Sequence, residues 1–288
     1  MMRKVVVAAV LLVAGIFEAP AQRIGIAYWN VEPLCDTLPS PFCNDADYTP
    51  RGRYRWTTER YRRKTEAVAA AIDSMAQPVV MLYGVENESV VRDIAAACTN
   101  DYSYIHRTMN SRDGLDFALL YFGDALRPDS VAVTGRNMVV RCRVAGRRTV
   151  LLMSRHADDA ERLARQIRRE RPDDALIAAG RLRPDAMRNA GLSDAFAAEE
   201  RAGRGERMRG GVWRFDERIC TDTLLAVRTG VYARRELFDR TGRAPLPTVV
   251  GNRYVGGTSR SLPMFVTVGW PDEAETAEKN GEKVGDLK

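Results

Sequence analysis

The sequence contains little histidine and little lysine. Of its 288 residues, two are histidines, His106 and His156, and five are lysines, whereas 39 are arginines. Histidine is the commonest metal-binding side chain, and no cysteine or histidine pair has the spacing of a zinc site, so the sequence argues against structural zinc. The net charge of +6 makes the chain mildly basic. Its cations are mostly guanidinium groups, which bind phosphate or carboxylate through two parallel hydrogen bonds.

Long hydrophobic runs are absent after the N-terminus. The composition is 45% hydrophobic and 28% charged, which excludes a disordered chain and a protein with several membrane spans. The length and the even spread of apolar segments favour one α/β domain over residues 22–270. No internal repeat and no interior linker favours a second domain. Residues 271–288 are rich in Glu, Lys and Gly, and we expect them to form a disordered tail.

Residues 1–21 have the pattern of a secretory signal peptide. A basic start is followed by an apolar run from Val5 to Phe17, and Ala19 and Ala21 are the small residues that a signal peptidase reads. We predict cleavage near Ala21 and a secreted or periplasmic mature chain. The run is short for a bilayer span. An uncleaved amphipathic anchor is the alternative.

The five cysteines fall into two groups. Cys35 and Cys43 lie in one loop rich in Pro, Ser and Asp. A disulfide between them would close a short loop and contribute about 2 to 3 kcal/mol. Cys98, Cys142 and Cys220 lie in apolar or strand-like contexts, and we expect them to be packed thiols.

Apolar periodicity predicts a chain that mixes helices and strands in both halves. The expected helices are 58–75, 89–98 and 158–171. The expected strands are 23–29, 79–85, 102–108, 117–122, 138–144, 148–153, 175–179, 211–215, 223–228 and 264–268. Two layers of sheet with helices outside is the natural architecture, because the inner faces of the sheets must be buried against each other.

Five segments, in order along nearly the whole mature chain, carry a family resemblance. They are 30–32 (NVE), 49–57 (TPRGRYRWT), 84–87 (GVEN), 114–121 (GLDFALLY) and 254–263 (YVGGTSRSLP). With these segments the chain resembles the endonuclease/exonuclease/phosphatase superfamily, which has the DNase I-like fold, and within it the secreted members of gut-type Bacteroidetes. The resemblance implies a four-layer α/β sandwich, in which two mixed sheets face each other and helices lie outside.

The resemblance also implies an active site that hydrolyses phosphate esters with a divalent cation and an activated water. The family's asparagine on the first strand is retained as Asn30. Its metal-binding glutamate corresponds to Gly84. Glu86 shares the strand face of residue 84 but lies about 6.6 Å further along the strand. Asn30 and Glu86 are therefore only a fallback set of metal ligands.

Other charged motifs of the family are replaced. The family's histidine near the end of strand 148–153 is missing, and His156 falls just beyond that position. The Gly-Asp-Phe-Asn motif reads Gly-Arg-Leu-Arg, with Arg181 and Arg183. The closing Ser-Asp-His-Leu-Pro motif reads Ser-Arg-Ser-Leu-Pro, with Arg260. Because guanidinium groups at these positions repel a cation, we expect no metal cofactor.

Two acidic residues match family acids, Asp116 in the 114–121 segment and Asp222 near a late strand. They are remnants of the catalytic set, or they form structural salt bridges with the incoming arginines, which is the interpretation the sequence favours. We expect Arg181, Arg183 and Arg260 to converge where active relatives hold metal. Two interpretations of that region stay open. It is a pocket for phosphate, nucleotide or carboxylate, or it is a filled cleft in which the arginines pair with Asp116, Asp222 or Glu86.

Three functions therefore stay open. The first choice is a pseudoenzyme that binds an anion or a partner without catalysis. The second is a hydrolase with a rearranged site built from Asn30, Glu86, Asp116 and His156, which would use Mg²⁺ or Mn²⁺. The third is a structural envelope-interaction protein, whose signature would be an exposed apolar patch outside the cleft. Nucleic acid is a further anionic partner, but the arginines of 162–171 fall at helical spacing and are most simply a solvated helix face.

Overall fold

Two mixed β-sheets face each other in the computed structural model, which describes residues 23–222 and 225–270. The predicted signal peptide and the predicted tail lie outside the described residues. In spatial order, the first sheet contains β13 (Ala226–Val231), β16 (Met264–Gly269), β1 (Arg23–Leu34), β2 (Val79–Val85), β4 (Asp116–Tyr121) and β3 (Ser103–His106). The second contains β5 (Leu126–Thr134), β6 (Asn137–Val144), β7 (Arg147–Ser154), β8 (Ala175–Gly180), β12 (Arg218–Asp222) and β9 (Leu192–Asp194).

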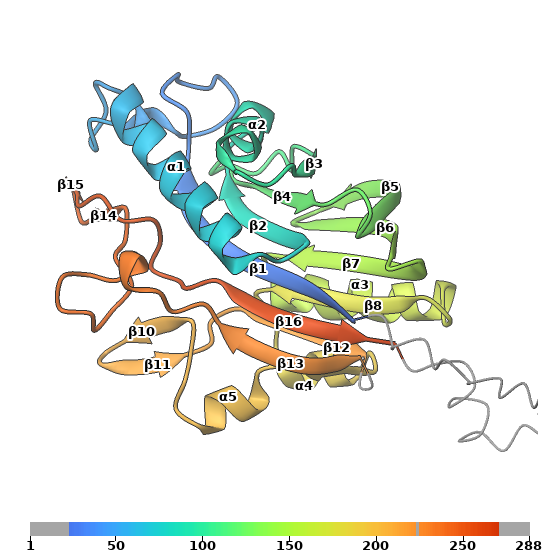
Figure 1. Cartoon of the computed structure of the whole chain (residues 1–288). Helices are drawn as coiled ribbons and strands as arrows, with labels where there is room; N and C mark the ends of the chain where they lie inside the picture. Colours follow the sequence, from blue (N-terminus) through green and yellow to red (C-terminus); the bar gives the residue numbers. More distant parts are fainter. Residues whose placement is uncertain (1–22, 223–224, 271–288) are drawn as a thin grey trace, which may run out of the picture.

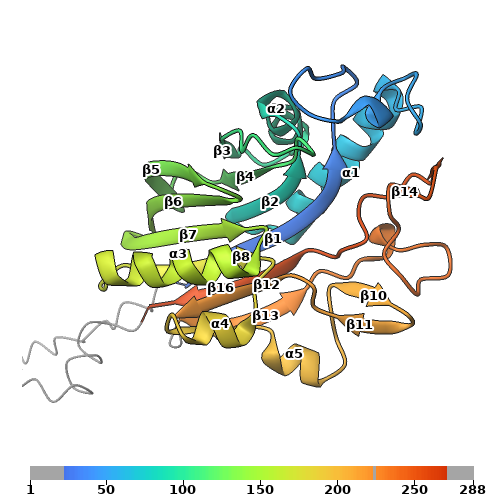
Figure 2. The same cartoon turned by 180° about the vertical axis from the view of Figure 1, so that it is seen from behind.

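Helices cover the outer faces of both sheets (Figures 1 and 2). The helices α1 (Thr58–Met75) and α2 (Glu88–Ala97) pack on the first sheet, and α3 (Ala157–Glu170) and α4 (Pro184–Arg188) pack on the second. The remaining elements are η1 (Ala46–Tyr48), α5 (Ala197–Arg201), the hairpin β10 (Arg207–Arg209) and β11 (Val212–Arg214), η2 (Arg235–Leu237), and the hairpin β14 (Val249–Val250) and β15 (Arg253–Tyr254). The four-layer α/β sandwich implied by the resemblance is confirmed.

Burial explains why these segments adopt their structures. The strand β2 is buried at every position, because the core between the sheets lies on one side of it and α1 and α2 lie on the other. The helix α1 buries Val68, Ile72 and Met75, which recur at helical spacing. Thr57 caps the N-terminus of α1 by accepting the N–H of Arg60.

The sequence predicted the long periodic elements well. Helix 58–75 and strand 79–85 have the predicted bounds, and α2 and α3 each begin one residue early. The strands β5 and β12 were not predicted. The first is an edge strand with mostly exposed side chains and a proline, and the second begins with a buried arginine, so neither has a clear apolar pattern. The late strand predicted at 223–228 instead begins at Ala226.

The cysteines are free thiols in the structure. The disulfide considered between Cys35 and Cys43 is not formed, and the Sγ of Cys43 lies against Gly114. Cys142 and Cys220 are buried and Cys98 is partly buried, as expected of packed thiols.

Polar residues at the ends of several strands lie together at one edge of the sandwich. The pairs β1–β2 and β7–β8 are parallel, so the carboxyl ends of their strands meet at the same edge of each sheet. Asn30 of β1 reaches Glu217, which precedes β12 of the other sheet. The two sheets therefore bring their polar ends together at this edge. No helix in the described ranges is long and apolar enough to cross a membrane.

Candidate functional site

Asn30 lies where β1 leaves its regular register with β2. Its Nδ2 donates a hydrogen bond to Oε1 of Glu217 at 3.0 Å, and its Oδ1 accepts the backbone N–H of Glu32 at 3.0 Å. The hydroxyl of Ser259 donates to the backbone oxygen of Asn30 at 2.6 Å, which fixes the closing 259–261 loop against β1. The structure thus places Asn30 at the expected edge, with both ends of its side chain engaged.

Two buried carboxyl groups accompany Asn30. Burial raises the pKa of Glu217 to about 7, although the hydrogen bond from Asn30 and the charge of Arg181 act to lower it. Burial and the charge of Glu217 raise the pKa of Glu206 to about 8. The Oε2 atom of Glu217 is buried and has no hydrogen-bond partner among the described residues. The sequence did not single out Glu206 or Glu217, whose neighbours include several arginines.

At position 84, where the family has its metal-binding glutamate, the backbone leaves no room for a side chain. Gly84 has a φ of +98°, and a Cβ at that position would lie 2.6 Å from the carbonyl oxygen of Glu32. Glu32 itself has a left-handed φ of +57°. A hard divalent cation needs several oxygen ligands, whereas Asn30 contacts one carboxylate in the described part of the chain and Arg181 acts on that same carboxylate. These residues do not fit the divalent cation that the resemblance implies.

Glu86 belongs to a different cluster. Its Oε2 accepts the backbone N–H of Asp36 at 2.8 Å, and its carboxylate lies within 4.8 Å of ligand atoms of Cys43 and Asp45. Burial is the main reason that the pKa of Glu86 is raised to about 8. The structure therefore does not bring together Asn30 and Glu86, the fallback metal ligands.

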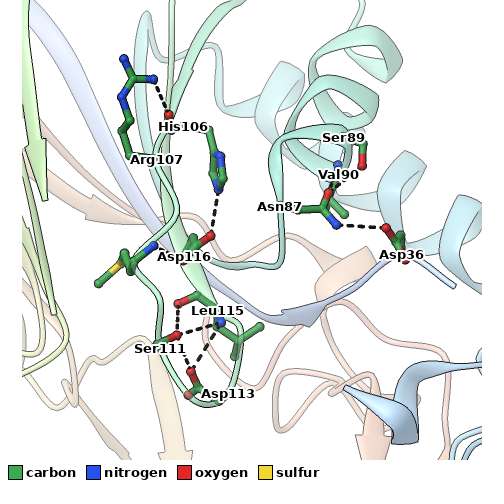
Figure 3. Close-up of polar contacts among 11 residues, drawn as sticks. Asp36, Asn87, Ser89, Val90, His106, Arg107, Ser111, Asp113, Leu115 and Asp116 are labelled. Atoms are coloured by element: carbon green, nitrogen blue, oxygen red, sulfur yellow. Dashed lines mark hydrogen bonds and ion pairs between the residues drawn. The ribbon is translucent and has the colours of Figure 1, made fainter. Parts of the chain in front are cut away.

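Asp116 is held by a histidine and not by an arginine (Figure 3). Its Oδ2 lies 3.0 Å from Nε2 of His106, and its Oδ1 accepts the N–H of Met109 at 2.8 Å. Asp116 and His106 are both buried. The proposed salt bridge between Asp116 and an incoming arginine is absent, because loop 107–115 folds back over the carboxylate first.

Asp222 lies at the opposite edge of the second sheet. It is the last residue of β12, which runs antiparallel to β8, so it lies beside the start of β8. Its carboxylate accepts the N–H of Leu176 at 2.8 Å and pairs with Arg168 of α3. Asp222 therefore does form a structural salt bridge, but with a helix arginine far from the expected site.

The three arginines predicted to converge do not meet. Arg183 pairs with Asp158 at 2.7 Å and is more than half exposed. Arg260 pairs with Glu32 at 2.9 Å and donates to the carbonyl of Val249. Each therefore binds a different acid. Arg181 alone of the three lines a large cleft.

That cleft has a volume of about 800 Å³ and is lined by four arginines, and we name it the arginine cleft. Its arginines are Arg112, Arg136, Arg155 and Arg181. Arg155 and Arg181 directly follow the parallel strands β7 and β8, which explains why their side chains share an edge. Sequence reasoning missed Arg112, Arg136 and Arg155. The position of Arg155 after a predicted strand was the available signal.

Arg155 is the most firmly placed of the four. It binds both carboxylate oxygens of Asp113, at 2.9 and 2.7 Å, and its guanidinium lies 4.6 Å from the ring centre of Tyr83. Arg112 and Arg136 have no acidic partner among the described residues. The lining therefore carries four guanidinium groups against one carboxylate, and also includes His156. The Nδ1 of His156 is buried with no hydrogen-bond partner among the residues described.

Comparisons with known proteins place this fold. Residues 25–163 match the model described as "Endonuclease/Exonuclease/phosphatase family". The structure is similar to D. rerio TDP2 complexed with single strand DNA product, at 15% identity over 86% of this chain and 99% of that chain, with a TM-score of 0.55. It is similar to a mannosyl-6-phosphatase of Bacteroides thetaiotaomicron, at 12% identity over 86% of this chain and 100% of that chain, with a TM-score of 0.58.

A third similar structure is an endonuclease/exonuclease/phosphatase from Bacteroides vulgatus, at 11% identity over 87% of this chain and 100% of that chain, with a TM-score of 0.57. No curated protein sequence matches the chain. The two facing six-stranded sheets of the described residues agree with the DNase I-like α/β sandwich of these neighbours. Over residues 25–163, the chain is similar to the endonuclease/exonuclease/phosphatase family.

Proposed function

We propose that this chain is a non-catalytic member of its family that binds an anion in the arginine cleft. The observation that carries the proposal is the charge of the lining, with four guanidinium groups against the single carboxylate of Asp113. A concave site lined by one sign of charge concentrates counter-ions. Guanidinium groups bind phosphate or carboxylate through two parallel N–H donors. Phosphate, a nucleotide or a carboxylate are the ligand classes that this charge favours.

The neighbouring carboxyl region, which contains Asn30, Glu206 and Glu217, supports the proposed loss of hydrolysis. Gly84 cannot be replaced by a metal-binding glutamate without a contact against the backbone of Glu32. Glu217 is the one carboxylate that Asn30 contacts among the residues described. We therefore propose that the chain uses no metal cofactor, since the metal ligands and the closing acid and base of active members are missing together.

The first experiment measures anion binding by calorimetry on residues 22–288, with inorganic phosphate as the probe. We expect saturable binding that weakens about tenfold in the double variant Arg136→Gln/Arg181→Gln, which corresponds to about 1.4 kcal/mol. Arg169→Gln is the matched control, because Arg169 is an exposed arginine near the C-terminal end of α3. Equal phosphate affinity in the native chain and the double variant would remove the arginine cleft from the proposal.

The second experiment tests the alternative of a surviving phosphoesterase. One observation favours this alternative, because the unpartnered Oε2 and the pKa of about 7 make Glu217 able to accept a proton at neutral pH. Phosphomonoesters and phosphodiesters are offered with Mg²⁺ or Mn²⁺ and with a chelator as control. We expect no turnover by a sample shown to be folded. Turnover abolished by the chelator and by Glu217→Gln would establish the hydrolase instead.

We further propose that the mature chain begins near Gln22 and acts outside the cytoplasm. The basic start, the short apolar run and the small residues at 19 and 21 support this proposal. Mass spectrometry of the N-terminal peptide from exported protein tests it. Recovery of a peptide that begins at Met1 in a membrane fraction would support an uncleaved anchor.

A further inference from the structure

A second pocket adjoins the arginine cleft. It has a volume of about 480 Å³ and shares Asn110 and Ser111 with the cleft as common lining residues. Loop 36–43 and the start of α2 form one side, and the loop between β3 and β4 forms the other, as Figure 3 shows for Asp36, Asn87 and Ser111. The two hollows are therefore neighbours.

The second pocket is lined by an apolar loop, and we name it the apolar pocket. Its apolar lining consists of Leu38, Pro39, Pro41 and Phe42. Phe42 is 92% exposed and Leu38 is 71% exposed. Two large apolar side chains only four residues apart are thus left in water at the rim of a hollow, where a bound apolar group would cover them.

Hydrogen bonds hold this loop in its shape. Asp36 accepts the N–H of Leu38 at 2.7 Å, Asp45 accepts the N–H of Ser40 at 2.9 Å, and Ser40 accepts the N–H of Phe42 at 3.2 Å. The two prolines restrict the backbone further. The apolar side chains are therefore displayed by an ordered loop, which lowers the entropy that a ligand must offset on binding.

The charges of the two hollows differ in sign. The apolar pocket is lined by Asp36, Glu86 and Asp116, and none of its lining residues is an arginine or a lysine. These carboxyl groups already accept protein hydrogen bonds, from the N–H groups of Leu38, Asp36 and Met109 among others. They offer no cation to an anionic ligand. An anion is therefore directed to the arginine cleft, and an uncharged group is left to enter the apolar pocket.

We propose that the ligand is an organic phosphate monoester with a compact, uncharged apolar body. The phosphate lies among Arg136, Arg155 and Arg181, and the body lies against Leu38 and Phe42, with Asn110 and Ser111 beside the ester linkage. This inference rests on the proposed anion binding. It adds the chemical class of the ligand and its orientation across the two pockets.

The test compares methyl phosphate with hexyl phosphate by calorimetry on residues 22–288. Both carry the same charged group, so the apolar body is the only difference between them. We expect hexyl phosphate to bind at least about tenfold tighter, which needs about two of its additional methylene groups to be buried. A hexyl phosphate that carries a carboxylate at its far end is expected to lose this advantage, because carboxylates line the apolar pocket.

The double variant Leu38→Ser/Phe42→Ser tests the position of the body. It should remove the preference for hexyl phosphate and leave methyl phosphate binding unchanged. Both side chains are largely exposed, so the fold should not depend on them. The control is Val250→Ser, which changes an exposed apolar side chain on the hairpin of β14 and β15.

The possible outcomes separate the two proposals. If both esters bind equally, the inference is overturned and the anion site stands. If neither ester nor inorganic phosphate binds, the anion site itself fails. A third arm uses vesicles of phosphatidic acid with phosphatidylcholine. Binding to the vesicles without binding to soluble hexyl phosphate would overturn the small-molecule ligand in favour of a lipid surface.

Discussion

The carboxyl region and the arginine cleft lie at the same edge of the sandwich, yet they treat charge in opposite ways. Glu206 and Glu217 are buried, and burial raises the pKa of each. Arg112, Arg136 and Arg181 of the cleft are exposed, so they keep their charge at little desolvation cost. Arg181 belongs to both regions, since it lines the cleft and acts on Glu217. The comparison teaches that burial decides which of these groups can meet an external ion.

The largest expected effect comes from restoring a carboxylate to the carboxyl region. We expect Gly84→Glu to lower the free energy of unfolding by about 3 kcal/mol or more, because the new Cβ meets the carbonyl of Glu32 at a left-handed φ. Urea unfolding measures this effect. Gly146→Glu is the control, since Gly146 also has a positive φ but has open space around it, and its cost should be about 1 kcal/mol. Equal losses of unfolding free energy in the two variants would show that the backbone of Glu32 shifts to make room for the new side chain.

The second prediction concerns the pH dependence of stability. The native pKa values of Glu217, about 7, and Glu206, about 8, lie above the ordinary value of 4.5. The native state therefore holds protons that the unfolded state has released, and the stability from these groups falls as pH rises from about 4.5 to about 8. Glu217→Gln should resemble the native chain at pH 5 and be more stable at pH 8 by on the order of 2 kcal/mol.

Thermal or urea unfolding at several pH values checks this dependence. Glu170→Gln serves as the control, because Glu170 is about half exposed and pairs loosely with Arg141 at 3.9 Å. Its effect on stability should be small and nearly independent of pH. Parallel pH profiles for the native chain and Glu217→Gln would show that Glu217 is ionised throughout.

The third prediction separates two arginines that lie two positions apart. Arg181→Gln should weaken phosphate binding by about fivefold, which corresponds to about 1 kcal/mol, because Arg181 lines the cleft. Arg183→Gln should leave it unchanged, because Arg183 pairs with Asp158 and is more than half exposed. Calorimetry with inorganic phosphate measures both. Equal losses in the two variants would mean that Arg183 also faces the ligand.

The smallest expected effect is that of Arg260→Gln. Arg260 pairs with Glu32 and donates to the carbonyl of Val249, so its loss should lower the free energy of unfolding by about 1 kcal/mol. Phosphate affinity should not change. Chemical denaturation and calorimetry on the same sample check both statements, and a weaker phosphate affinity would place Arg260 at the cleft after all.

The periodic apolar segments of the sequence predicted the fold. For the site, the sequence predicted which backbone segments come together, but not where their side chains point. Asn30 and the 259–261 loop meet as the resemblance implies, because the framework contact between Ser259 and the backbone of Asn30 depends on small residues that are still present. The arginine side chains were harder to place. Arg260 turns toward Glu32, a contact that depends on a left-handed residue that no sequence pattern marked.

The arginine cleft was missed for a related reason. Its members come from four separate segments, and Arg112 and Arg136 lie in turns whose position depends on the packing of the two sheets. A long side chain can reach several partners, so its direction is decided by the nearest acid and not by its position in the sequence. Arg183 forms an ion pair with Asp158 in this way, and Arg155 forms one with Asp113.

The contact between Asp222 and Arg168 has a mechanical consequence for the cleft. Helix α3 starts directly after His156 at the cleft and carries Arg168 near its other end, where that side chain pairs with Asp222. A 14-residue helix spans roughly 21 Å, so α3 acts as a strut between the two edges of the second sheet. Asp222→Asn should loosen the far end of this strut, which amide hydrogen exchange would detect as faster exchange along the last turns of α3, while the helical start beside the cleft keeps its protection.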